Sequence, residues 1–161
     1  QGSTLPYRFV PDGPGGFLVQ KAPRGQLETF NPLELYLMGL LPAKDVPPSF
    51  LLRDETANLR EGMRLSSSDV VQVTIQEVLQ ACGPRVPDQR AAQKQFRCAT
   101  IVLSEALLDA KSLSFYDYFA RRAEAREPLP VAMGFSQGIE KPWFAATGGR
   151  STMVSRISGN P

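Results

Sequence analysis

The residue types that carry out catalysis in most enzymes are scarce in this chain of 161 residues. It contains no histidine, which excludes imidazole zinc sites, Ser-His and Cys-His nucleophile systems and the commonest general base. Its two cysteines cannot form a four-thiolate zinc site, and neither the G-x-G-x-x-G nor the G-x-x-x-x-G-K-[ST] phosphate motif occurs. We therefore expect no catalytic residue, no metal ligand and no cofactor-binding residue in this chain.

Carboxylates offer the remaining route to catalysis. Glycosidases use two carboxyl groups at a defined separation, and Glu34 with Glu61 is one pair that the sequence offers. Because the chain has 16 acidic residues, such pairs arise by chance, and we do not expect a carboxylate-only enzyme. Asp12-Gly13 lacks the alternating carboxylates of a calcium loop and predicts a plain turn.

Two arginines are the candidate binding residues. Arg85 and Arg150 each lie beside Gly or Pro in a predicted loop, where a guanidinium can clamp a carboxylate of a ligand or of the protein. A structural ion pair is the alternative role for both. Both are therefore candidate ligand-binding or structural arginines.

Cys82 and Cys98 form a candidate disulfide. Closing the loop between them would contribute about 3 kcal/mol in the chain-entropy model, in an oxidising compartment. The alternative is that Cys98, inside the apolar run of residues 96–103, is a small buried hydrophobic residue. The sequence leaves both interpretations open.

The charge balance argues against a nucleic-acid partner. Lys and Arg number 18 against 16 acidic residues, and the basic residues are scattered. The densest basic stretch, Arg121, Arg122 and Arg126, is interrupted by Glu124 and followed by Glu127, which predicts a solvated helix face with internal ion pairs. No apolar run approaches the ~20 residues that cross a bilayer, so we expect no membrane span.

The elements that would position these residues alternate between short strands and short helices. A Pro- and Gly-rich turn between residues 7–10 and 17–20 predicts a β-hairpin. The other predicted strands are residues 50–52, 63–65, 70–73, a long central strand at 96–103 and a final strand at 151–157.

Capping signals predict the helices. Asn31, Pro32 and Glu34 begin a helix that should end at Gly39 and be buried, because it is apolar nearly all round. Further helices are predicted at residues 75–82, with Val78 and Leu79 facing the core, at 113–126, capped by Ser112, and at 141–147, ended by Gly148-Gly149. The aromatic stripe of helix 113–126 is typical of core packing, with a ligand groove as the alternative.

These elements predict an α+β fold. We expect residues 1–161 to form a single domain in which short helices pack on a small, mostly antiparallel sheet. The chain does not begin with Met and lacks the features of a signal peptide, so we expect it to be a fragment or C-terminal portion of a larger protein.

Four stretches of the chain stand out as a set. They are residues 30–42 (FNPLELYLMGLLP) with 46–48, residues 73–75 leading to 83–87 (GPRVP), residues 143–150 (WFAATGGR), and the Gly-rich turn of residues 7–17. Together they resemble stretches of uncharacterised bacterial secreted proteins that look like zinc metallopeptidases with an H-E-x-x-H helix. The H-E-x-x-H region itself has no counterpart here, so no zinc ligand or catalytic glutamate can be assigned to any residue of this chain.

The resemblance implies a non-catalytic C-terminal portion of a secreted hydrolase, which scaffolds or partly lines a substrate cleft. Zinc would then belong to the parent protein, and the partners would be the upstream part of the same polypeptide and a protein or peptide substrate. The alternative is an independent extracellular binding or adhesion module without enzymatic activity.

Overall fold

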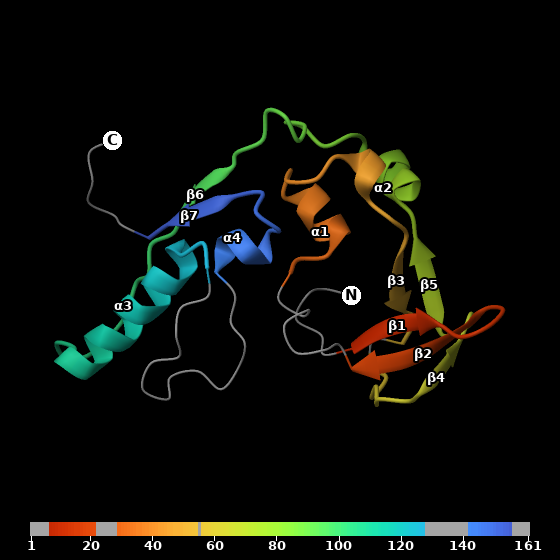
Figure 1. The fold of residues 1–161 in the computed structure, drawn as a ribbon, viewed down its shortest axis with the longest axis horizontal. Helices are drawn as coiled ribbons and strands as arrows, with labels where there is room; N and C mark the ends of the chain where they lie inside the picture. The colour runs from red at the N-terminus through yellow and green to blue at the C-terminus, as the bar shows by residue number, and fades with distance from the viewer. Residues whose placement is uncertain (1–6, 22–28, 55, 128–141, 156–161) are drawn as a thin grey trace. The chain divides into compact units, whose positions relative to one another are not determined.

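The computed structural model describes residues 7–21, 29–54, 56–127 and 142–155 (Figure 1). It divides into two compact units, Gln1–Ala92 and Gln93–Pro161. We describe each unit separately and call them the N-terminal and C-terminal units.

The N-terminal unit begins with the predicted β-hairpin. Strands β1 (Tyr7–Pro11) and β2 (Gly16–Lys21) pair antiparallel, and β4 (Arg64–Ser66) adds to the far side of β2 in the order β1-β2-β4. The predicted turn at Asp12-Gly13 is confirmed: Asp12 N donates to the carbonyl of Gly16 at 2.9 Å. The Asp12 carboxylate forms an exposed ion pair with Arg64 at 3.3 Å.

A second, two-stranded sheet packs against this one. Strands β3 (Ser49–Leu52) and β5 (Val70–Val73) are antiparallel, with Ser49 opposite Val73. The buried core contains Phe17, Val19, Leu65 and Val70, and the rings of Phe17 and Phe50 lie 4.8 Å apart. Because these residues come from β2, β4, β5 and β3, burial of apolar side chains holds the two sheets together.

Helix α1 (Pro32–Leu37) has the predicted capping box. Asn31 Oδ1 accepts hydrogen bonds from the amides of Leu33 and Glu34, and Glu34 Oε2 accepts one from the Asn31 amide at 2.7 Å. The expectation of burial all round is only partly right, because Leu35 and Tyr36 are buried whereas Leu37 is 58% exposed.

Helix α2 (Ile75–Cys82) follows β5 directly and also begins with the predicted capping box, formed by Thr74 and Glu77. Ile75 is the buried residue of this helix. Val78 and Leu79, which we expected to face the core, are only half-buried. Between the two helices, the short 3-10 helix η1 (Ala43–Asp45) continues the chain from α1 toward β3.

The C-terminal unit contains a small parallel sheet instead of the long central strand expected at residues 96–103. Strand β6 (Gln95–Arg97) pairs with β7 (Thr152–Val154). The backbone amide of Cys98 donates to the carbonyl of Val154. Beyond Cys98 the apolar run leaves the sheet, and Leu103 is 93% exposed. The prediction is wrong because β7 offers a partner for three residues only.

Helices α3 (Ala110–Glu124) and α4 (Trp143–Ala146) complete this unit. The cap of α3 is Asp109, whose carboxylate accepts from the Ser112 amide at 2.7 Å, so the predicted cap at Ser112 is wrong by one turn. Tyr118 is the buried residue of α3 and its other aromatic residues are half-buried. The expected helix start at residue 141 and the end of the last strand at 156–157 lie outside the described residues.

The predicted α+β class, with mostly antiparallel sheets, is confirmed. None of the helices described is long and apolar enough to cross a membrane. Both cysteines are free and exposed, Cys82 in the N-terminal unit and Cys98 in the C-terminal unit. The alternative of a buried Cys98 is therefore wrong: its apolar neighbours in sequence do not bury it, because the described residues after β6 leave the sheet. The candidate disulfide stays a prediction, because Cys82 and Cys98 belong to different units.

Candidate functional site

A cleft of about 260 Å³ lies within the N-terminal unit. Its lining comes from α1, from the segment after it, from α2 and from the loop of residues 84–90. The residues are Tyr36, Leu41, Pro42, Ala43, Leu79, Pro84, Arg85, Asp88, Gln89 and Arg90. The cleft therefore combines an apolar wall with two arginines, one of which is a candidate binding residue from the sequence.

Arg85 joins the loop of residues 84–90 to α1 through hydrogen bonds. Its backbone amide donates to Tyr36 Oη at 3.1 Å, and its Nε donates to the carbonyl of Leu37 at 2.8 Å. Its Nη1 donates to the carbonyl of Pro87. The Leu37 carbonyl belongs to the last turn of α1, where carbonyl groups have no amide partner within the helix. Arg85 therefore supplies the hydrogen-bond donor that this carbonyl lacks in the helix.

Gly39 leaves the space that the Arg85 side chain needs to make these hydrogen bonds. It has a φ of +76°, and a Cβ atom placed there would come within 2.6 Å of Arg85 Cζ and of the Ala92 Cβ. Glycine is thus required both for the left-handed backbone after α1 and for the close approach of the Arg85 guanidinium. The predicted helix stop at Gly39 is confirmed, and the position also shapes the cleft.

Asp88 and Arg90 form the polar edge of the cleft. Asp88 Oδ1 accepts from the amides of Arg90 and Ala91, both at 3.0 Å, and the Asp88 carbonyl accepts from the Ala92 amide. The carboxylate thus caps its own turn of chain. Arg90 is exposed, and its guanidinium has no hydrogen bond or ion pair within the described part of the chain.

Arg150, the second candidate arginine, lies in the C-terminal unit and faces the end of α4. Its Nη1 donates to the carbonyls of Gly148 at 3.3 Å and Thr147 at 3.5 Å. Both arginines that the sequence singled out thus cap the carbonyl end of a short helix. They belong to different units.

A buried polar cluster lies beside Arg150. Trp143 Nε1 donates to Ser151 Oγ at 2.7 Å, and the Ser151 amide donates to Thr147 Oγ1 at 3.3 Å. Thr147 and Ser151 are the buried polar residues of the described chain. Their hydrogen bonds are satisfied within the cluster, which is typical of a structural network.

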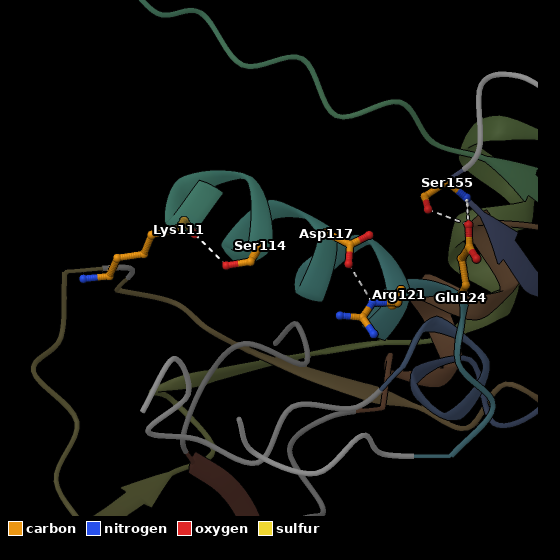
Figure 2. Close-up of polar contacts among 6 residues, drawn as sticks. All are labelled: Lys111, Ser114, Asp117, Arg121, Glu124 and Ser155. Atoms are coloured by element: carbon orange, nitrogen blue, oxygen red, sulfur yellow. Dashed lines mark hydrogen bonds and ion pairs between the residues drawn. The ribbon is translucent and has the colours of Figure 1, made fainter. Parts of the chain in front are cut away.

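Helix α3 carries Arg121 and Arg122 of the densest basic stretch, and several of its polar residues make contacts within the C-terminal unit (Figure 2). Arg121 forms an ion pair within the helix with Asp117, one turn away, at 2.9 Å. Glu124 instead accepts from the backbone and hydroxyl of Ser155, so it ties the helix end to the residue after β7. Arg122 lies 4.5 Å from the ring centroid of Phe119.

Glu34 and Glu61, the carboxylate pair that the sequence offers, have different surroundings in the structure. Glu34 is bound in its capping box, and Glu61 is exposed. Capping and turn hydrogen bonds hold the pKa of four carboxyl groups below their ordinary values: Asp54, Asp69, Glu77 and Asp109. A general acid at neutral pH needs a raised pKa, so these shifts point to structural roles.

The donor set does not fit the zinc that the resemblance implies. Within the described residues, no group of three or more His, Cys, Asp or Glu side chains could hold a metal ion. The sequence has no histidine at any position. We therefore derive no zinc chemistry from this chain.

Sequence reasoning found Arg85 from its Gly and Pro neighbours but missed Tyr36 and Arg90, whose place in the cleft depends on contacts across the chain. The only local signal for Arg90 is its position two residues after Asp88, in a segment that begins with an Asp cap. No family model, no curated protein and no solved structure matches this chain. The cleft and its contacts are accordingly the basis for a function.

Proposed function

We propose that the chain is a non-catalytic C-terminal portion of a secreted, bacterial, metallopeptidase-like protein, and that its cleft lines part of the path of a peptide substrate. Hydrolysis and zinc binding would then belong to the upstream part of the same polypeptide. The proposal starts from the sequence resemblance and from the lack of histidine.

One observation carries the proposal. Two of the stretches that carry the resemblance, residues 30–42 and 83–87, supply five of the ten residues that line the cleft, and the hydrogen bonds from Arg85 to Tyr36 and Leu37 join them. Residues distant in sequence that share a resemblance and also share a cleft are best explained by a common binding role. The alternative, an independent extracellular binding module, uses the same cleft without an upstream peptidase.

The first test is the polypeptide that precedes Gln1 in the full gene product. The proposal expects an H-E-x-x-H sequence there, zinc bound to the full-length protein, and peptide hydrolysis by that protein. The isolated chain should neither hydrolyse peptides nor retain zinc after dialysis, measured by metal analysis. A gene product without H-E-x-x-H would overturn the peptidase assignment and leave the binding module.

A second test addresses scaffolding directly. The upstream part should be produced alone and together with this chain, and its thermal unfolding and peptide hydrolysis compared. We expect the upstream part to be less stable and less active alone, because it would lose the surface that packs on this chain. Equal stability and activity with and without the chain would contradict the proposed role.

A further inference from the structure

The cleft of the N-terminal unit has an apolar wall beside a cationic edge. Leu41, Pro42 and Leu79 are among the residues of the wall, and Arg85 and Arg90 supply the charge. We propose that this cleft binds the C-terminal carboxylate of a peptide whose last residue has an apolar side chain. The inference rests on the proposed function for the peptide nature of the ligand, whereas the carboxylate and the apolar side chain follow from the cleft.

Arg85 is held in place before any ligand arrives. The carbonyls of Leu37 and Pro87 accept hydrogen bonds from its Nε and Nη1, and Gly39 lies against its guanidinium. Its Nη2 has no partner within the described residues and keeps its hydrogen atoms for a ligand. A guanidinium that is already oriented loses less rotamer entropy on binding, which favours an anion at this place.

The charges around the cleft favour an anion as well. Asp88 is the acidic residue of the lining, and its Oδ1 is engaged by the amides of Arg90 and Ala91. The lining also has two positive charges, the guanidinium groups of Arg85 and Arg90. The Arg90 guanidinium is exposed and has no partner within the described chain. The lining is therefore net positive, and a carboxylate complements it.

The size of the cleft limits the ligand to a small unit. Clefts that enclose drug-sized molecules have volumes of roughly 300–1,000 Å³, and this cleft, at about 260 Å³, lies below that range. The smallest peptide unit that presents a carboxylate and an apolar side chain together is a C-terminal apolar residue. An internal acidic residue would need a neighbouring residue to fill the apolar wall, which requires more space.

The test is binding of a fluorescein-labelled peptide, Gly-Ser-Gly-Ser-Ala-Leu with a free carboxylate, to the whole chain by fluorescence anisotropy. Removal of the charge by C-terminal amidation should weaken binding about tenfold or more, the effect of one charge-assisted hydrogen-bond pair. Replacement of the terminal Leu by Ser should also weaken binding. Binding should weaken as salt is raised, because the cleft edge is open to solvent.

Two variants separate the cleft from net charge. Arg90→Ala removes an exposed guanidinium at the cleft and should weaken binding of the free-carboxylate peptide several-fold, without affecting the amidated peptide. Arg60→Ala removes the same charge from an exposed residue of the same unit that does not line the cleft, and should leave binding unchanged. Circular dichroism of both variants verifies that they fold.

The outcomes are decisive in each arm. Equal affinity for the free and amidated peptides, equal loss in both variants, or no binding of the peptide would overturn the inference. Displacement of the peptide by octanoate at equal concentration would assign the cleft to free carboxylic acids and would also overturn it. Peptide binding by a chain whose gene product has no H-E-x-x-H would sink the peptidase proposal while leaving the cleft assignment intact.

Discussion

Substitution of Gly39 by alanine tests the steric basis of the cleft. Gly39 ends α1 with a φ of +76°, and an added Cβ would lie 2.6 Å from both Arg85 Cζ and Ala92 Cβ. Carbon atoms do not approach this closely without a shift of one partner, because their attraction is best at about 3.5–4.0 Å. The variant must therefore displace the guanidinium, the turn that carries Ala92, or α1 itself.

The expected cost has a backbone part and a packing part. A left-handed conformation costs a residue with a Cβ about 1–2 kcal/mol relative to glycine. Overpacking a close contact typically costs a further 1–3 kcal/mol. The Arg85 side chain is long, but the carbonyls of Leu37 and Pro87 hold its end, and the Ala92 Cβ cannot move without its backbone. We expect Gly39→Ala to destabilise the N-terminal unit by about 2–5 kcal/mol.

Gly62→Ala is the matched control. Gly62 has a φ of +82°, and a Cβ placed there meets no atom within 4 Å, so only the backbone part of the cost applies, about 1–2 kcal/mol. Urea denaturation followed by circular dichroism measures both variants, and hydrogen exchange of the Leu40 amide, which donates to Leu35, reports on the N-terminal unit. Equal destabilisation by the two substitutions would refute the crowding at Gly39.

Three further predictions test individual contacts. Leu103→Ala should change the free energy of unfolding by less than about 0.5 kcal/mol, because its side chain is exposed; a loss of 2–5 kcal/mol, typical of a buried leucine, would restore the predicted central strand. Ser151→Ala should cost about 1–3 kcal/mol by leaving Trp143 Nε1 without its acceptor, and should alter the fluorescence of this single tryptophan; an unchanged spectrum would contradict the hydrogen bond. Hydrogen bonds from the Thr74 backbone and then its hydroxyl lower the pKa of Glu77 below its ordinary 4.5. The ionised Glu77 side chain therefore stabilises the fold fully above pH 4.5, and this stabilisation disappears as the pH falls through the lower pKa of the folded state. Glu77→Gln should therefore lose less stability on acidification than the unchanged chain in urea denaturation across that range, and equal losses would refute the shift.

The features that sequence predicted correctly are those whose hydrogen bonds join near neighbours. Both capping boxes, at Asn31 and at Thr74, close over three residues, so the residue types at that spacing specify the start of the helix directly. The hairpin of β1 and β2 is similarly local, because Pro and Gly determine its turn. At α3 the cap is Asp109 and not the predicted Ser112, because Ser112 supplies the amide that the Asp109 side chain caps.

The features that sequence missed depend on partners elsewhere in the chain. An apolar run such as residues 96–103 shows that a segment can be buried in a sheet, and does not show that a partner strand exists. In the C-terminal unit β7 covers only the first part of the run, and Leu103 and Leu107 are exposed. The cleft poses the same difficulty, since the bond that closes it joins Arg85 to Tyr36 across 49 positions in sequence.

The way in which the cleft uses its polar groups favours binding over catalysis. Tyr36 Oη accepts from the Arg85 amide, Asp88 Oδ1 accepts from two amides of its own turn, and Arg85 donates to two backbone carbonyls. Each of these contacts fixes the cleft and leaves the phenol and the carboxylate engaged with the backbone. The positive charge of Arg85 and Arg90 beside an apolar wall is available to a ligand. Arginine stays protonated in proteins, so this charge can orient an anion but cannot take a proton from it or give one to it. Under the proposed function, this charge orients the end of a peptide, and cleavage of that peptide would belong to the upstream part of the same polypeptide.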